Sequence, residues 1–243
     1  MLYYSLPPGG VQNERAAAPS ALHRVRHVVI LSTILCRIIK HKAPVLGPNE
    51  LDRVLAAVGD LLEARGEQVG IVVVGGASLN LLGLLERTTS DVDVIAQVHV
   101  SEEADERTLA PAEPIPQPLL DAIRKVARDF NLPADWMNTV IGAQWDFGLP
   151  PGLTEDLTWR RYGGKRYGGL LVGLAGRRTL IALKLFAGVD QGPESVHVQD
   201  LIALHPTESE LAAAARWVQS QDSAPAFKEM TQEVVAYVQR KGA

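Results

Sequence analysis

The chain has 243 residues, a formal net charge of −4, 47% apolar residues and 21% charged residues. These values are ordinary for a globular protein, and the length suffices for one α/β domain with a small helical part. The negative charge excludes a basic surface over the whole molecule, so any nucleic-acid contact has to be a local patch. The one cysteine, Cys36, excludes an internal disulfide framework and fits a reducing cytoplasm, and zinc ligation has little support.

Residues 1–46 are predicted to form a poorly ordered or accessory N-terminal extension. The first 19 residues are rich in Pro, Gly and Ala and have no apolar period. Residues 28–39 are apolar but include Arg37, and a membrane-spanning helix needs about 20 apolar residues. We therefore expect no membrane insertion; a packed helix or strand and an added upstream extension are the alternatives.

Hydrophobic periodicity predicts the elements of the first half of the remaining chain. Helices are expected where apolar residues recur every three or four positions, and strands where short β-branched runs occur. The predicted elements, in chain order, are a helix from 48 to near 66, a strand over 71–74, a helix over 77–86, a strand over 91–97 and a helix over 119–130. Residues 98–118 are polar and rich in proline, so we expect a long surface loop there.

The second half is predicted to contain a hairpin and then helices. Strand-like runs flank Gly163-Gly164, which is a hairpin signal, after a Gly- and Pro-rich loop over 142–155. The hairpin mixes basic and aromatic residues, which either grip an RNA backbone or form an ordinary solvated hairpin with half-buried rings: Trp159, Arg160, Arg161, Tyr162, Lys165, Arg166 and Tyr167. Helices are expected over 177–189, 207–220, where Thr207 and Glu210 form a capping box, and 224–241.

The stretch from Val72 to Ile95 has the pattern of a metal site. A β-branched run is followed by a leucine-rich turn and helix, and Asp91-Val-Asp93 then opens a second apolar run. Side chains alternate along a strand, so Asp91 and Asp93 face the same way. Two neighbouring carboxylates make poor core residues and good ligands for a hard divalent cation.

The same stretch has the pattern of a phosphate site. Gly75 and Gly76 end the first strand and permit a tight turn. The first N–H groups of the following helix are unpaired and favour an anion, and the Ser78 hydroxyl is predicted to add a further donor. A phosphate site followed by a metal site is the minimum equipment for nucleotidyl or phosphoryl transfer.

This combination resembles the nucleotidyltransferases of the DNA polymerase β superfamily. More narrowly, it is similar to the AbiEii-type proteins, known as nucleotidyltransferase toxins of toxin–antitoxin and phage-defence systems. The residues that carry the resemblance are Gly75, Gly76, Arg87, Thr89, Asp91 and Asp93. The resemblance implies an α/β (α+β) fold of the polymerase-β type, a small mixed sheet flanked by helices. Residues 47–176 would form the core, and residues 177–243 a helical C-terminal part that completes the cleft.

The resemblance also implies a reaction and its participants. An NTP would be the substrate, Mg²⁺ or Mn²⁺ the cofactor, and a hydroxyl of tRNA or another RNA the acceptor, in a cytoplasmic protein with an antitoxin as partner. Asp91 and Asp93 would bind the metal and act in catalysis with Lys184. The residues expected to bind the nucleotide are Gly75, Gly76, Ser78, Arg87 and Asp200.

Three of the expected site residues have alternative interpretations. Related toxins carry a lysine in a helix comparable to that of Lys184, but a lysine in an apolar helix also extends to solvent or pairs with an acid. This sequence keeps His197-x-x-Asp200 and lacks the arginine that family members tend to have after Asp190. Asp200 is alternatively a capping or salt-bridge residue, and the role of His197 stays open.

A third carboxylate, which this superfamily usually brings from a later strand, is missing from the expected place. The strand over 169–174 has no acid, and Asp135 and Asp146 in loops are the only candidates nearby. A carboxylate from the region 190–200 is the alternative. The absence favours a second hypothesis, a catalytically weak or inactive nucleotide-binding or protein-interaction module on the same fold. A Rossmann dinucleotide site is excluded because Gly-x-Gly-x-x-Gly is absent.

The segment from Asp135 to Asn138 is similar to a Trp-Leu-Asn element of related proteins. We therefore expect it near the site. The alternative is a loop held in place by a buried Trp136.

Overall fold

The computed structural model describes residues 45–100, 107–164 and 169–242. The predictions for residues 1–44, with their apolar run, lie outside these ranges. Leu46, the last residue of the predicted extension but one that the structure describes, is buried. It pairs with Thr89 through two backbone hydrogen bonds of 2.7 and 3.0 Å. None of the helices in the described ranges has an apolar stretch long enough to cross a membrane.

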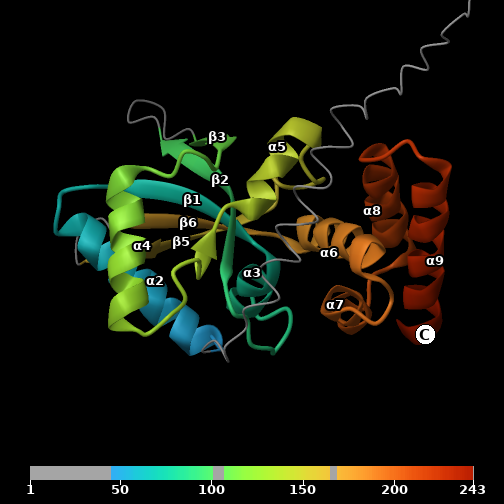
Figure 1. Ribbon diagram of the computed structural model, residues 1–243, viewed down its shortest axis with the longest axis horizontal. Helices are drawn as coiled ribbons and strands as arrows, with labels where there is room; N and C mark the ends of the chain where they lie inside the picture. The colour runs from blue at the N-terminus through green and yellow to red at the C-terminus, as the bar shows by residue number, and fades with distance from the viewer. Residues whose placement is uncertain (1–44, 101–106, 165–168, 243) are drawn as a thin grey trace, which may run out of the picture. The chain divides into compact units, whose positions relative to one another are not determined.

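A six-stranded mixed sheet forms the centre of the fold, with the strand order β3-β2-β1-β6-β5 and β4 paired with β2 (Figure 1). The β1–β6 and β2–β4 pairs are parallel, and the β1–β2, β2–β3 and β5–β6 pairs are antiparallel. The strands are β1 (Val69–Val74), β2 (Val92–Val100), β3 (Arg107–Pro111), β4 (Met137–Asn138), β5 (Leu157–Tyr162) and β6 (Leu170–Ala175). The predicted α/β class, a mixed sheet flanked by helices, is confirmed.

Helices flank the sheet in two groups. In Figure 1, α2 and α4 lie side by side against the sheet, whereas α6 to α9 lie together at the end where β6 leads into α6. The helices are α2 (Pro48–Glu63), α3 (Gly75–Leu81), α4 (Gln117–Asp129), the 3-10 turn η1 (Val140–Ala143), α5 (Gln144–Phe147), α6 (Arg177–Gln191), α7 (Val196–Leu204), α8 (Glu208–Ser220) and α9 (Pro225–Gly242). The predicted capping box of α8 is present, with Thr207 and Glu210 bonded to each other's backbone N–H groups.

The central strand β1 separates two hydrophobic clusters. Ile71 and Val73 face the cluster that contains α2 and α4, and Val72 and Val74 face the cluster that contains α6 to α9. Because β1 is covered on both faces, its sequence is a continuous apolar run and not an alternating one. This burial fixes the strand that carries the glycine bend at its end.

The prediction of a surface loop over 98–118 was wrong. β2 continues to Val100, and β3 pairs with it as an edge strand, Leu109 opposite Val98. A five-residue edge strand that ends in Pro111 has a weak sequence pattern, since its pairing with β2 stabilises it more than its own composition does. The predicted loop over 142–155 likewise contains the single helical turn α5.

The basic and aromatic side chains of β5 are used within the fold. The Tyr162 hydroxyl donates to Asp52 on α2 at 2.8 Å, and Arg160 contacts Asp52 and the Leu81 carbonyl. On the other face, Trp159 lies beneath the Arg107 guanidinium at 4.7 Å. For β5 these contacts favour the packed-hairpin interpretation over the RNA-binding one. The other residues of that prediction, Lys165, Arg166 and Tyr167, lie outside the described residues.

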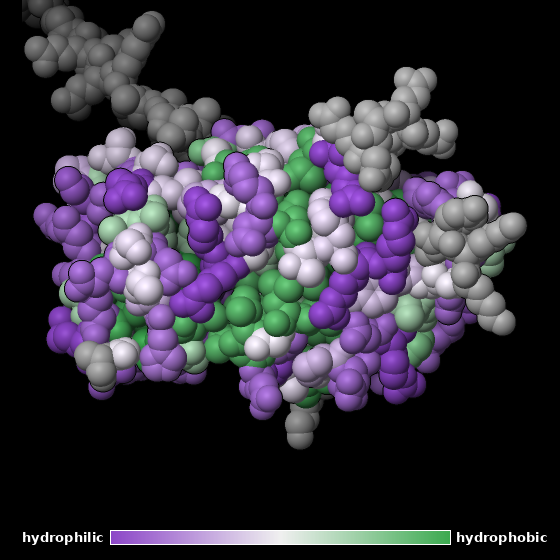
Figure 2. All heavy atoms as spheres, turned by 180° about the vertical axis from the view of Figure 1, so that it is seen from behind, coloured by the Kyte–Doolittle hydropathy of each residue, from purple (hydrophilic) through white to green (hydrophobic). Residues whose placement is uncertain are grey.

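The face of the molecule seen from behind has a hydrophobic band across its middle, bordered by hydrophilic residues (Figure 2). Leu109, Leu157 and Trp159 are only partly buried against the second cluster. The sheet is therefore covered less completely on this side than on the side of α2 and α4.

At Gly59, α2 packs so closely against β5 that there is no room for a side chain. A Cβ at Gly59 would overlap the backbone carbonyl of Tyr162, which has no freedom to rotate away. We expect Gly59→Ala to lower the free energy of unfolding by about 2 kcal/mol despite the better helix propensity of Ala. Urea unfolding followed by circular dichroism measures this. Ala64→Ser, an addition of one atom at the exposed end of the same helix, should stay within about 0.5 kcal/mol of the wild type.

Candidate functional site

The glycine bend and the acidic pair meet at the end of β1. Val74 lies opposite Asp93 in the β1–β2 register, so Gly75, the first residue of α3, begins directly beside the Asp93 side chain. Gly75 has φ +70°, and a Cβ there would overlap Asp93 Oδ2. Glycine is therefore required twice, by the backbone conformation and by the close approach of the carboxylate.

The second glycine packs against the segment that leads into the acidic pair. A Cβ on Gly76 would lie 2.7 Å from Thr89 Oγ1 and 3.2 Å from an Arg87 nitrogen. Thr89 is buried, and its hydroxyl lies 3.2 and 3.3 Å from the carbonyl and a carboxylate oxygen of Asp91. The segment from Arg87 to Asp93 thus packs against both glycines of the bend, with Asp93 beside Gly75 and Thr89 beside Gly76.

The environment of Asp93 disfavours the ionised form of its carboxyl group in the free protein. Burial and the neighbouring carboxylate of Asp91 raise the pKa of Asp93 to about 6, and Asn138 and Lys184 act in the opposite direction. Asn138 Nδ2 donates to Asp93 Oδ1 at 3.3 Å. Two acids held together in this way form a donor set suited to a hard divalent cation, which would relieve their repulsion.

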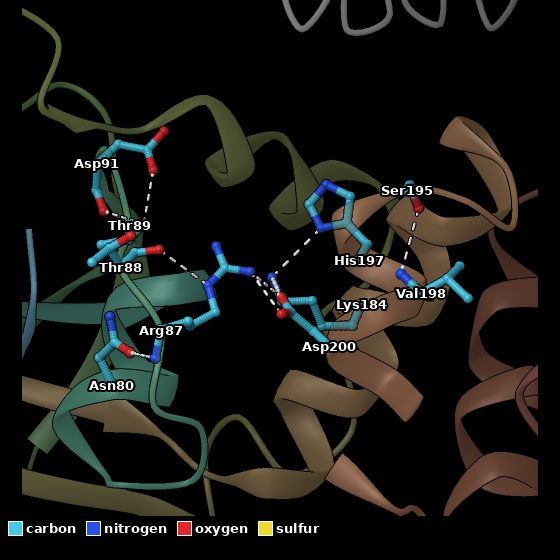
Figure 3. Close-up of polar contacts among 10 residues, drawn as sticks. All are labelled: Asn80, Arg87, Thr88, Thr89, Asp91, Lys184, Ser195, His197, Val198 and Asp200. Carbon is cyan, nitrogen blue, oxygen red and sulfur yellow. Dashed lines mark hydrogen bonds and ion pairs between the residues drawn. The ribbon is translucent and has the colours of Figure 1, made fainter. Parts of the chain in front are cut away.

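A second group of charged residues joins α6 and α7 to the site (Figure 3). The Arg87 Nη1 atom lies 2.7 and 2.6 Å from the two carboxylate oxygens of Asp200, and Lys184 Nζ lies 2.7 Å from Asp200 Oδ2. Lys184 Nζ is also 3.5 Å from His197 Nδ1. We call Arg87, Lys184, His197 and Asp200 the cation cluster; with neutral His197 it carries two positive charges and one negative charge.

Local structure explains how the cation cluster is held. Lys184 on α6 and Asp200 on α7 are both only 5% exposed, so the ion pair is well shielded from water. The Ser195 hydroxyl caps α7 by accepting from the Val198 N–H at 3.4 Å. The Arg87 backbone N–H donates to Asn80 Oδ1 on α3 at 3.3 Å.

The structure therefore brings together most of the predicted site residues. Gly75, Gly76, Arg87, Asp91 and Asp93 lie around the bend. Arg87 connects the cation cluster to the bend, because it lies beside Gly76 and pairs with Asp200.

Ser78 has a different partner from the one we expected. It is fully buried, and its hydroxyl donates to the Ala175 carbonyl at 2.9 Å, which ties α3 to β6. The predicted role of Ser78 as a phosphate ligand has no support in this geometry. Its neighbour Asn80, which the sequence did not single out, is buried and has an Nδ2 group without a hydrogen-bond partner among the described residues.

The third carboxylate is not found where the structure is described. No group of three or more His, Cys, Asp or Glu side chains in the described ranges is close enough to hold a metal. The two candidates Asp135 and Asp146 are exposed and complete no such group. The position beside Asp93 on the adjacent strand is instead occupied by Asn138, as the β2–β4 register shows.

Both interpretations of the segment around Trp136 hold. Trp136 is buried, and its indole N–H donates to the Ile123 carbonyl at 3.2 Å, so it fixes the segment against α4. The residues after it form β4 and bring Asn138 to the acidic pair.

Comparison with protein families identifies one matching segment. Residues 49–144 match a family described as "Nucleotidyltransferase of unknown function (DUF6036)". This segment is similar to a nucleotidyltransferase. It runs from α2 through the bend and the acidic pair to Asn138, and it ends before the helices that carry Lys184 and Asp200. The match supports nucleotidyl transfer in general. The searches of curated proteins and of solved structures gave no match.

The raised pKa of Asp93 predicts a pH-dependent stability. The pKa is about 6 in the folded chain against an ordinary 3.8, so the free energy of unfolding falls as the pH rises from about 4 to about 6. Asp93→Asn removes this loss and should be more stable than the wild type above pH 6, by about 2 kcal/mol, and lose this advantage near pH 4. Urea unfolding in EDTA between pH 4 and 8 measures the difference. Equal curves for wild type and variant would contradict it.

The charges of the cation cluster predict opposite outcomes for two substitutions. Asp200→Asn leaves Arg87 and Lys184 facing each other without a counter-charge, so we expect a loss of about 3 kcal/mol in the free energy of unfolding. Lys184→Met leaves Asp200 paired with Arg87 and should cost no more than about 1 kcal/mol. The double variant should recover part of the loss caused by Asp200→Asn. Equal effects of the two single substitutions would show that the cluster does not act as one unit.

Proposed function

We propose that this protein is a divalent-metal-dependent nucleotidyltransferase that moves an NMP from an NTP to an acceptor hydroxyl. In keeping with the resemblance to the AbiEii-type toxins, we propose RNA, with tRNA as the first candidate, as the acceptor. We also propose a toxin or phage-defence setting with an antitoxin protein as partner.

One observation carries the proposal: the Asp93 carboxylate packs directly against Gly75 at the end of β1. The contact supports an acidic pair beside a bend whose following backbone N–H groups would bind an anion. The match of residues 49–144 to a nucleotidyltransferase family independently supports the same class of reaction. A structural acid would be expected to have a basic partner, whereas the charged group with the largest effect on the pKa of Asp93 is another acid, Asp91.

The residues around the bend would have separate roles in the reaction, metal binding and phosphate binding. Asp91 and Asp93 would hold Mg²⁺ or Mn²⁺, which neutralises charge on the triphosphate when bound. The backbone N–H groups that follow the glycine bend would bind phosphate oxygens. Transfer forms a bond from the acceptor oxygen to the α-phosphorus and breaks the bond from that phosphorus to the bridging oxygen. Pyrophosphate leaves, and the hydroxyl proton passes to solvent.

The cation cluster is suited to the leaving pyrophosphate. Its net charge of +1 comes from Arg87 and Lys184 opposed by Asp200. Asp200 holds the two cations in position before the substrate arrives, so little side-chain ordering remains to be done on binding. Pyrophosphate oxygens and Asp200 would then share the same donors.

A second candidate function rests on the missing third acid. Without it, the fold would bind a nucleotide or a partner protein and turn over slowly or not at all. Calorimetry would show tight NTP binding with no Mg²⁺ requirement, and no product would form.

Nucleotidyl transfer can be tested with the purified chain, each of the four α-labelled NTPs, Mg²⁺ and total tRNA. We expect label on RNA with at least one NTP, and Asp91→Ala and Asp93→Ala should reduce it by at least about 100-fold, because both metal ligands are needed. The control is Asp129→Asn, which alters an exposed acid on α4 that pairs with Lys125 and should leave the rate unchanged. Absence of label with every NTP, or label that persists in Asp91→Ala, would contradict the proposal.

A further inference from the structure

The strand next to Asp93 carries an amide where a third acid would complete the metal site. β4 pairs in parallel with β2 so that Asn138 lies directly opposite Asp93, and Val74 lies opposite it on the other side. Asp93 therefore has the glycine bend on one flank and Asn138 on the other. A side chain at position 138 is the one on the adjacent strand that reaches the Asp93 carboxylate, at 3.3 Å.

The hydrogen bonds of Asn138 give it a fixed orientation. Its Nδ2 donates to Asp93 Oδ1, while its Oδ1 accepts from the Val140 N–H at 3.1 Å at the start of η1. The side-chain amide of Asn138 is thus hydrogen-bonded both to the backbone and to one oxygen of the Asp93 carboxylate. The other oxygen, Oδ2, packs against Gly75. Such outer partners of metal ligands commonly set the orientation of the ligand and the affinity for the metal.

The charges around this position limit how many cations the site can hold. Asp91 and Asp93 balance one divalent cation. Before a nucleotide binds, a second divalent cation would add two positive charges that no third acid in the described ranges offsets, and the cation cluster is itself positive. An aspartate at position 138 would supply that charge, and asparagine does not.

We propose that Asn138 replaces the third acid of the metal site, so that it positions Asp93 and limits the site to one divalent cation. The inference rests on the proposed metal-dependent function of the acidic pair. It assigns to the protein a single-cation site, in which the acceptor hydroxyl receives no second metal to lower its pKa. Asn138 is a positioning residue and need not touch the nucleotide.

Manganese binding tests the proposal without depending on turnover. Mn²⁺ is titrated into the full chain without nucleotide, and free Mn²⁺ is counted by electron paramagnetic resonance. We expect the wild type to bind one Mn²⁺ per chain. Asn138→Leu, which cannot hold Asp93, should bind it about tenfold more weakly. Asn138→Asp keeps the acceptor for the Val140 N–H and should bind it about tenfold more tightly, or bind a second ion, because a third charge joins the site.

The neighbouring Thr139 provides a matched control. Its hydroxyl donates to Glu113 at 2.6 Å, whereas the Asn138 side chain donates to Asp93. Thr139→Val should leave the Mn²⁺ affinity within about twofold of the wild type, a smaller change than loss of a positioning residue. Circular dichroism spectra of all variants report whether η1 and β4 keep their structure.

The outcomes separate this inference from the function on which it rests. Two Mn²⁺ ions bound by the wild type, or equal affinities of the wild type, Asn138→Leu and Asn138→Asp, would overturn the role of Asn138 alone. Absence of Mn²⁺ binding by the wild type, or binding that survives Asp91→Asn, would overturn both the inference and the proposed metal site.

Discussion

The close packing of the Asp93 carboxylate on Gly75 is the contact on which the candidate site depends. It requires that β1 end and β2 begin at the same edge of the sheet, and the antiparallel register of Val74 with Asp93 provides this. The burial of β1 on both faces fixes the position of the bend. Burial of the core therefore holds Asp93 at the bend although Asp91 raises its pKa, and acids with a raised pKa occur often at functional sites.

The C-terminal helices contribute to this site through charge. Asp200 on α7 pairs with Arg87, which precedes the acidic pair by only a few residues, and also with Lys184 on α6. The cation cluster is thus a link between α6, α7 and the loop before β2. Because the ion pair of Lys184 and Asp200 is shielded from water, its geometry is constrained by burial as well as by attraction. These ion pairs consequently join α6 and α7 to the candidate site, although the nucleotidyltransferase match ends before both helices.

The sequence predicted the structural features that depend on residues close to one another along the chain. The glycine bend and the capping box of α8 each depend on residues within a few positions of one another, and both are present. Features set by distant pairing were missed. Ser78 donates to a carbonyl 97 positions away, β3 exists because β2 extends to meet it, and Asn138 reaches Asp93 only through the two-residue pairing of β4.

The charges of the two halves of the site are complementary to those of a metal-bound nucleotide. The acidic pair alone is repulsive, and the raised pKa of Asp93 expresses this repulsion together with burial. The cation cluster alone has one positive charge too many for its single carboxylate. A divalent cation relieves the first imbalance and a phosphate chain relieves the second, and a metal–triphosphate complex carries both. The two imbalances offset each other only in part, because the pKa of Asp93 stays raised to about 6 although Lys184 lowers it. Under the proposed function, one ligand would correct what remains of both.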